Sequence, residues 1–216
     1  MKIKNYEILC FQMSDNYNTN CYLIINLDLN KCFIVDPGSG CKLLIETIKN
    51  KGLQIDFIYI THGHFDHWAG MNELYQSFDD LLIYFPYNGD CWLKKENNPL
   101  DFVLKTYIKV YKNDVIKFHG LDLKVYFTPG HSIDSTIIYI KYLNVLLTGD
   151  TLFFRSVGRS DFIFSSPNDL KSSVEFLYKT FLIENPICLP GHGISTFIED
   201  EYNENPFFSK KNLFIK

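Results

Sequence analysis

Short runs of β-branched and aromatic residues alternate with segments of helical spacing along the first half of the chain. Runs typical of strands lie at 3–11, 20–27 and 32–36, and they are followed by helical spacing at 41–51 and an apolar strand at 55–60. The pattern then predicts a helix at 70–78 and a strand at 81–85. The stretch from 87 to 106 is expected to be helical, with a break at Pro99.

The second half repeats this order of strands before helices. The pattern predicts strands at 121–127, 136–142 and 145–147, a long helix at 167–181 that begins with proline, and a short strand at 187–189. Two sheets packed face to face, with helices on both outer faces, would bury the apolar side of every element. The chain has 216 residues with neither a linker nor a repeat, so we expect a single domain over 1–216.

Composition narrows the class of protein. Hydrophobic residues make up 46% of the chain and aromatic residues 16%, as in a globular protein. The net charge is -4 and no basic run is present, which argues against a nucleic-acid partner. The sequence shows no apolar run of membrane-spanning length and no leader pattern, and its six cysteines form no C-x-x-C pair. We therefore expect a cytoplasmic protein with reduced thiols and no membrane association.

A histidine-rich motif, T-H-G-H-F-D-H at 61–67, follows the expected strand at 55–60 directly. Residues i and i+2 of an extended segment point to the same side, so His62 and His64 can bind one metal ion together. Asp66 and His67 come after the chain turns, and they can face a second ion nearby. Imidazole and carboxylate ligands are typical of zinc, iron or manganese sites rather than of calcium or magnesium sites.

Three more candidate ligands follow expected strands farther along the chain. They are His131 in T-P-G-H-S, Asp150 in T-G-D-T and His192 in P-G-H-G. A neighbouring glycine lets the backbone turn sharply beside each of them. His119 has no such context, and we expect it at the surface. Asp36, before Pro37-Gly38, has two open interpretations: it orients a ligand histidine, or it only forms a turn.

The order of these motifs resembles the metallo-β-lactamase superfamily, from Asp36-Pro37-Gly38 to Asn205-Pro206-Phe207. The resemblance implies an αββα sandwich of two mixed sheets with two divalent metal ions at one edge. Zinc is expected, with iron and manganese as the alternatives. It also implies a first site of His62, His64 and His131, a second site of Asp66, His67 and His192, and Asp150 as a bridge between the two ions. Asp66 and Asp150 are expected to serve catalysis as well as metal binding.

Such a centre makes hydroxide available at neutral pH, and attack of metal-bound hydroxide on a carbonyl carbon is the expected reaction. The segments 148–153, 157–162 and 190–193 resemble the short, single-domain glyoxalase-II-like (hydroxyacylglutathione hydrolase-like) branch. That branch implies a thioesterase with a small-molecule substrate such as S-lactoylglutathione. The chain ends soon after Asn205-Pro206-Phe207, without the helical extension of full-length glyoxalase II, so recognition of glutathione stays open.

Two alternatives use the same scaffold. One is a persulfide dioxygenase with a single iron ion, against which the intact P-G-H-G motif argues. The other is a lactone or β-lactam hydrolase, which needs the same hydroxide attack.

The chain has 21 basic residues, of which only Arg155 and Arg159 are arginine. The planar guanidinium of Arg159 could bind a substrate carboxylate. The alternative is an internal ion pair with Asp161 that holds the loop.

Overall fold

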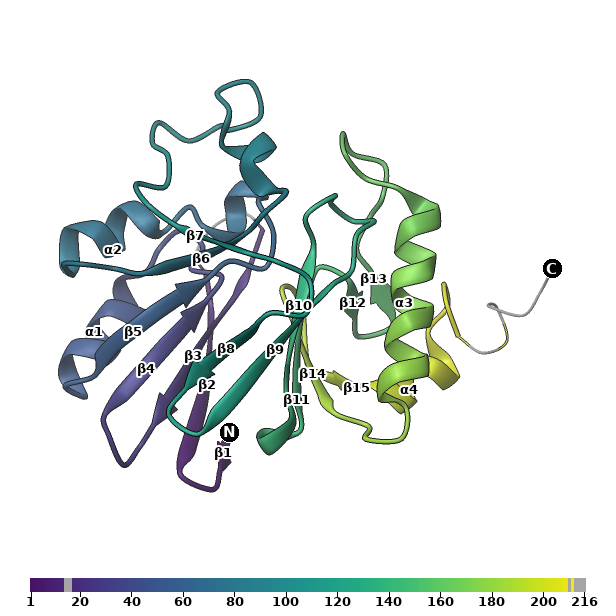
Figure 1. Cartoon of the computed structure of the whole chain (residues 1–216), viewed down its shortest axis with the longest axis horizontal. Coiled ribbons are helices and arrows are strands. Elements are labelled where there is room, and N and C mark those ends of the chain that lie inside the picture. Colours follow the sequence, from purple (N-terminus) through teal and green to yellow (C-terminus); the bar gives the residue numbers. More distant parts are fainter. Residues whose placement is uncertain (14–16, 210, 212–216) are drawn as a thin grey trace. The chain divides into compact units, whose positions relative to one another are not determined.

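Two mixed β-sheets form the frame of the protein in a computed structural model, which describes residues 1–13, 17–209 and 211 (Figure 1). The chain divides into two compact units, Met1–Val110 and Tyr111–Lys216, and each unit builds one of these sheets together with its own helices.

The sheet of the first unit has seven strands in chain order. They are β1 (Lys2–Ile3), β2 (Tyr6–Gln12), β3 (Asn20–Asn26), β4 (Lys31–Val35), β5 (Gln54–Tyr59), β6 (Ile83–Pro86) and β7 (Ile108–Val110). Strands β1 to β4 pair antiparallel, and β4 to β7 pair parallel. Because β4 and β5 are parallel neighbours, the segments that follow them start at the same edge of the sheet.

Helices α1 (Lys42–Asn50) and α2 (Met71–Ser77) connect the parallel strands of this sheet. In α1, Leu44 and Ile48 lie one turn apart and are fully buried in the core of the unit. Two short 3₁₀ helices complete the unit, η1 (Phe65–His67) within the histidine-rich motif and η2 (Gly89–Leu93) after β6.

The sheet of the second unit has six strands in the order β15-β14-β11-β10-β9-β8. They are β8 (Val115–Phe118), β9 (Leu121–Phe127), β10 (Thr136–Ile140), β11 (Val145–Gly149), β14 (Ile187–Pro190) and β15 (Thr196–Phe197). Strand β10 is antiparallel to both β9 and β11, and β11 is parallel to β14. Strands β9, β11 and β14 therefore run in the same direction and end at one edge.

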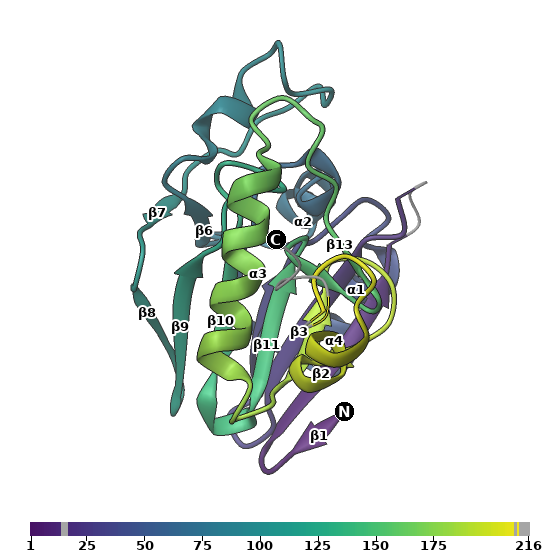
Figure 2. The same cartoon turned by 90° about the vertical axis from the view of Figure 1, so that its right-hand side faces the viewer.

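Helix α3 (Pro167–Phe181) lies along one face of this second sheet, over β9 to β11 (Figure 2). Its start follows from the sequence, because the Ser166 side chain accepts a hydrogen bond from the amide of Asp169, and Pro167 occupies the first helical position. Its buried side chains recur at helical spacing: Leu170, Val174, Leu177, Tyr178 and Phe181. A short hairpin of β12 (Leu152–Phe153) and β13 (Ser156–Val157), the 3₁₀ helix η3 (Lys141–Leu143) and helix α4 (Ile198–Glu204) complete the unit.

The prediction of a helix over 87–106 is wrong. Within that stretch the structure has only η2, followed by turns. The side-chain amide of Asn97 donates to the backbone carbonyl of Cys91 at 2.8 Å. The side-chain amide of Asn98 donates to the backbone carbonyl of Phe102, also at 2.8 Å. These asparagine side chains bond to the backbone in place of helical partners, and Pro99 removes a further donor. The expected strand at 136–142 ends earlier, at Ile140, and turns into η3.

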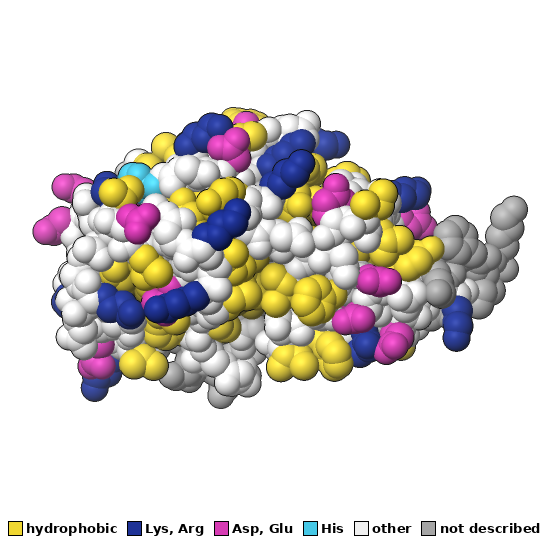
Figure 3. Space-filling model, turned by 90° about the horizontal axis from the view of Figure 1, so that it is seen from below, with side chains coloured by type: hydrophobic (Ala, Val, Ile, Leu, Met, Phe, Trp, Pro, Cys, Tyr) yellow, Lys and Arg dark blue, Asp and Glu magenta, His cyan; other side chains and the backbone are white. Residues whose placement is uncertain are grey.

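Within the part of the chain that the structure describes, no helix combines the length and the apolar character needed to cross a membrane. On the face of the molecule shown in Figure 3, basic and acidic side chains are interspersed rather than gathered into a basic patch.

Candidate metal centre

The predicted ligands lie directly after strands of each sheet. In the first unit, Asp36 follows β4, and the motif at 61–67 follows the parallel neighbour β5. In the second unit, His131, Asp150 and His192 follow β9, β11 and β14, which run in the same direction. Each sheet therefore presents its candidate ligands at a single edge, as sites at the carboxyl ends of strands usually do.

His62 and His64 form a pair in the first unit. Nε2 of His62 lies 3.0 Å from Nδ1 of His64, and the ring centroids are 4.6 Å apart. On the other side of the ring, Nδ1 of His62 lies 3.1 Å from the hydroxyl of Thr61. Two ring nitrogens that face one another at this distance can share one ion, as the i, i+2 spacing predicts.

Asp66 and His67 form a second pair in the same unit. Oδ2 of Asp66 lies 3.4 Å from Nε2 of His67, and it accepts a hydrogen bond of 2.8 Å from the hydroxyl of Thr19. The rings of His62 and His67 have centroids 4.2 Å apart, so the two pairs are adjacent.

Asp36 contacts residues next to or within both pairs. Its Oδ2 lies 2.9 Å from Nδ1 of His67, and its two oxygens accept hydrogen bonds of 2.7 Å from the amide and the hydroxyl of Thr61. Asp36 is buried, and this geometry is the one that the histidine-orienting interpretation of Asp36 requires.

In the second unit, one carboxylate faces two imidazoles. Oδ2 of Asp150 lies 3.4 Å from Nε2 of His131 and 3.3 Å from Nε2 of His192. Nδ1 of His131 is bound to the carbonyl oxygen of Arg159 at 2.8 Å, so the ring presents Nε2 to Asp150. The amide of Gly191 donates to the carbonyl of Gly149 at 2.9 Å, which ties the two ligand-bearing turns together.

Gly158, in the loop after the β12–β13 hairpin, packs directly on these ligands. A Cβ atom at this position would lie 2.0 Å from the carbonyl oxygen of Asp150 and 2.8 Å from the ring of His131. Only a residue without a side chain fits here without displacing one of the two ligands.

Arg159 is engaged within its own loop. Its Nε and Nη2 donate to the two oxygens of Asp161 at 2.7 and 2.8 Å, and the guanidinium lies 4.1 Å from the centroid of the Phe162 ring. The hydrogen bond from Arg159 holds the pKa of Asp161 below its ordinary value. The Phe162 ring in turn meets His131 edge-on, with centroids 6.1 Å apart. The internal ion pair considered from the sequence is thus present, while a substrate contact of Arg159 stays a prediction.

Arg155 has a different role, which the sequence did not reveal. Its Nη1 donates to Oε1 of Glu201 at 2.8 Å, and its backbone amide donates to Oε2 at 2.9 Å. The fully buried Glu201 also accepts hydrogen bonds from Thr196 and Asn205. This cluster of Arg155, Glu201, Thr196 and Asn205 joins the β12–β13 hairpin to α4.

The donors in both units fit divalent metal ions. Every one of the seven predicted residues carries a side chain capable of holding an ion. His62, His67, Asp66, His131 and Asp150 are buried, and His64 and His192 are half-buried. Buried imidazoles and carboxylates that face one another, with other side chains or carbonyls behind them, are the arrangement that metal sites use.

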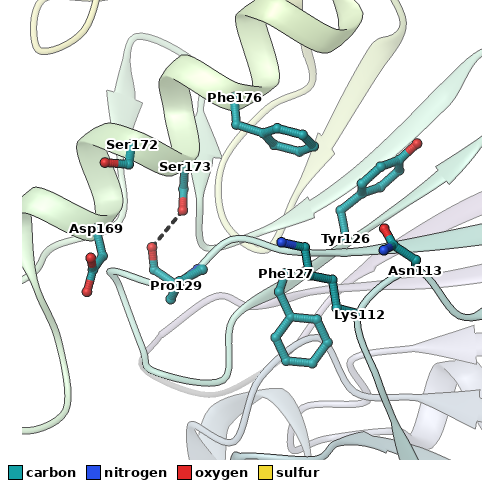
Figure 4. A pocket seen from close by; sticks show the side chains of 9 residues that line it. All are labelled: Lys112, Asn113, Tyr126, Phe127, Pro129, Asp169, Ser172, Ser173 and Phe176. Atoms are coloured by element: carbon teal, nitrogen blue, oxygen red, sulfur yellow. Dashed lines mark hydrogen bonds between the residues drawn. The ribbon is translucent and has the colours of Figure 1, made fainter.

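A separate cavity of about 310 Å³ lies in the second unit between β9 and α3 (Figure 4). Lys112, Tyr126 and Phe176 are among its lining residues, and the lining contains none of the predicted ligands. On its wall, the hydroxyl of Ser173 donates to the carbonyl of Pro129 at 2.7 Å and so holds the loop that leads to His131.

His119 lies in the tight turn between β8 and β9, where it is half-buried and takes a left-handed φ of 39°. This position, followed by Gly120, suits a two-residue hairpin turn. Thr19 and Glu201, by contrast, were not predicted to support the site. No local motif marks their long-range contacts, since Thr19 bonds to Asp66 and Glu201 bonds to Arg155, each across more than 40 positions.

Comparisons with known proteins agree with these observations. The sequence model of the metallo-beta-lactamase superfamily matches residues 15–192. A probable metallo-hydrolase, YqgX of Bacillus subtilis (strain 168), is 31% identical over 90% of this chain and 94% of its own length. Hydroxyacylglutathione hydrolase GloC of Haemophilus influenzae (strain ATCC 51907 / DSM 11121 / KW20 / Rd) is 30% identical over 98% of this chain and 100% of its own length.

Among solved structures, the BLEG-1 B3 metallo-beta-lactamase is similar with a TM-score of 0.79 and 27% identity, over 93% of this chain and 99% of that one. The fold class predicted from the motifs is thereby confirmed. The matching region contains every predicted ligand, and the chain belongs to the metallo-β-lactamase superfamily.

Proposed function

We propose that this protein is a metal-dependent hydrolase with a dinuclear centre and that it cleaves a thioester such as S-lactoylglutathione. The observation that carries the proposal is the position of Asp150, whose Oδ2 lies within 3.4 Å of the Nε2 atoms of His131 and His192. A carboxylate between two ligand imidazoles suits the role of a bridge between two ions. Membership of the superfamily supports the same assignment.

Seven residues would hold the ions. The first ion is assigned to His62, His64 and His131, the second to Asp66, His67 and His192, and Asp150 to both. Bound divalent ions supply hydroxide at neutral pH and polarise a carbonyl oxygen.

The chain's own contribution is to fix protons and ring orientations. The carboxylate of Asp36 keeps the proton of His67 on Nδ1, which leaves the Nε2 lone pair available. The carbonyl of Arg159 does the same for His131. The hydroxyl of Thr19 donates a hydrogen bond to Oδ2 of Asp66, so this carboxylate is held in place.

Two considerations favour a thioester. The segments at 148–153 and 157–162 resemble the glyoxalase-II-like branch. The relative named hydroxyacylglutathione hydrolase aligns over its whole length with nearly all of this chain. A protein of similar length therefore carries that name, which supports the choice of a glutathione thioester. We accordingly propose a small-molecule substrate, with a glutathione conjugate as the first choice.

A second candidate activity is hydrolysis of β-lactams, which the similarity to a B3 metallo-beta-lactamase favours. The same attack on a carbonyl would open the ring, so the fold alone does not decide between the two.

A substrate panel tests the proposal. Protein loaded with zinc, iron or manganese would be assayed on S-lactoylglutathione, a coenzyme A thioester, a lactone and a β-lactam. We expect the glutathione thioester to be cleaved with the highest kcat/KM. Cleavage of the β-lactam alone would replace the thioesterase by the second candidate. One iron ion per chain, together with oxygen consumption on a glutathione persulfide, would overturn the hydrolase.

A further inference from the structure

Both tryptophans of the chain contact the same glycine, Gly63, which separates the ligands His62 and His64. The indole nitrogen of Trp68 donates to the carbonyl oxygen of Gly63 at 3.0 Å. Trp92 packs on the Cα side, since a Cβ atom at Gly63 would lie 2.3 Å from Cδ1 of Trp92 and 2.7 Å from its Cγ. The peptide between the two ligands is therefore bound on one side and packed on the other.

Trp92 also touches a ligand directly. Its ring meets the ring of His64 edge-on, with centroids 4.5 Å apart and planes at 75°. Trp92 and Trp68 are both buried, and Trp68 meets Phe102 edge-on at 5.5 Å. Neither indole is thus a mobile surface group.

The 3₁₀ helix η2, which carries Trp92, is fastened to the chain around β7. Asp90 accepts a hydrogen bond of 2.9 Å from the hydroxyl of Tyr107 and forms an ion pair with Lys109. Desolvation by burial, together with hydrogen bonding to Asp90, raises the pKa of Tyr107 to about 12, so this hydroxyl remains a donor at neutral pH. The position of Trp92 is therefore fixed by contacts outside the histidine motif.

We propose that Trp68 and Trp92 are positioning residues that fix the Gly63 peptide and thereby preorganise His62 and His64 for metal binding. Glycine has the widest choice of backbone conformations, so a glycine between two ligands leaves their separation poorly determined by the motif itself. The two indoles remove that freedom in the folded protein, and a preorganised site spends less binding free energy on ordering its ligands. This inference rests on the proposed metal centre.

A purely structural role predicts a different result. Tryptophans that only fill the core would stabilise the fold without affecting the affinity for metal. The matched control is Ile48→Ala, which truncates a fully buried side chain of α1 in the core cluster that contains Trp68. Loss of that side chain should lower thermal stability and leave metal binding unchanged.

The test is a titration of metal-free protein with Co²⁺ against a chromophoric chelator. It would use the wild type, Trp92→Ala, Trp92→Phe, Trp68→Phe and the control. Loss of a group that orients a ligand typically lowers metal affinity about 10- to 100-fold, and we expect that loss for Trp92→Ala. Trp92→Phe, which keeps a ring against Gly63 and His64, should recover most of the affinity. Trp68→Phe removes the donor and part of the ring while keeping an aromatic side chain, and it should also weaken binding.

Two spectroscopic signals accompany the titration. The visible absorption band of the Co²⁺-loaded protein should shift in Trp92→Ala, because the geometry of the ligands changes. When the protein is excited at a wavelength that tyrosine does not absorb, emission of the wild type comes from these two indoles alone, so it should be quenched in step with Co²⁺ occupancy.

Wild-type affinity and an unchanged band in both Trp92→Ala and Trp68→Phe would overturn the inference while leaving the proposed function intact. If Trp92→Ala does not fold, Trp68→Phe decides. A wild-type protein that binds no Co²⁺ would instead overturn the proposed function, and with it this inference.

Discussion

Three of the predicted ligand histidines contact supporting groups through Nδ1. The partners are the hydroxyl of Thr61 for His62, the carboxylate of Asp36 for His67 and the carbonyl of Arg159 for His131. In each case Nε2 faces another predicted ligand. These contacts select the tautomer and the ring orientation in advance, so they should contribute to metal affinity.

Replacing Asp36 tests this contribution at one residue. Asp36→Asn keeps the size of the side chain but places an amide where a carboxylate oxygen contacted His67 or Thr61. We expect the affinity for the second metal ion to fall about 10- to 100-fold in a chelator competition. The matched control is Asp28→Asn, which alters an exposed aspartate outside the motif. Equal affinity in both variants would contradict the orienting role.

Gly158 offers a steric test at the same scale. The new Cβ of Gly158→Ala would meet the carbonyl of Asp150 and the ring of His131, and we expect loss of bound metal and of hydrolysis. Gly52→Ala is the control, because Gly52 has a left-handed φ of +61° but nothing within 4 Å of its Cβ position. That variant should lose stability by about 1 kcal/mol and keep its metal. A Gly158→Ala protein with full metal content would show that the close packing is not required.

At this scale the sequence indicated seven candidate ligands, whose role in metal binding stays a prediction, and only part of what contacts them. Histidines and aspartates beside glycines after a strand are local signals, and His62 to His67 fall within six residues. The hydroxyl of Thr19, however, reaches Asp66 across 47 positions, and no local pattern marks such a partner.

Within each unit, neighbouring parallel strands bring the turns that carry the predicted ligands together. Strands β11 and β14 are parallel, and the amide of Gly191 bonds to the carbonyl of Gly149 where both strands end. The β12–β13 hairpin that follows Asp150 is then joined to α4 through Arg155 and the buried Glu201. We infer that Arg155 stabilises this part of the fold and that Arg159 does so much less.

The two arginines of the chain can be compared directly, with the Arg159 variant as the control for the Arg155 variant. Arg155→Met leaves the carboxylate of Glu201 buried without its cation, and we expect the free energy of unfolding to fall by about 3 kcal/mol. Arg159→Met breaks a pair whose two side chains are 62% and 66% exposed, so its free energy of unfolding should hardly change. Denaturant unfolding of both variants measures the difference. Equal stabilities would contradict the structural role of Arg155.

Elements with strong local signals were predicted well. Helix α3 has the predicted bounds because a capping serine, a first-turn proline and helical spacing all agree. The stretch 87–106 was mistaken for helix because its apolar residues mimic helical spacing, while asparagine-to-backbone hydrogen bonds decide its fold. Short elements such as β12, β13 and β15 have two residues each, too few for a readable pattern.

For the whole molecule, the motifs predicted the superfamily and its fold, because they span most of the chain in a fixed order. The substrate is a different matter. One fold hosts many activities, and the side chains that select a thioester over a lactone carry no comparable signature. Whether 1–216 acts as one domain stays a prediction, since the structure describes two compact units.

The central proposal is that the seven predicted ligands hold two metal ions, with Asp150 as the bridge between them. The most direct measurement is the metal content per chain of the wild type and of Asp150→Ala, taken on samples that are also assayed for hydrolysis of S-lactoylglutathione. The account predicts two divalent ions per chain in the wild type, and loss of metal together with loss of hydrolysis in the variant. A single ion in the wild type, or an Asp150→Ala protein that keeps both ions and its activity, would contradict it.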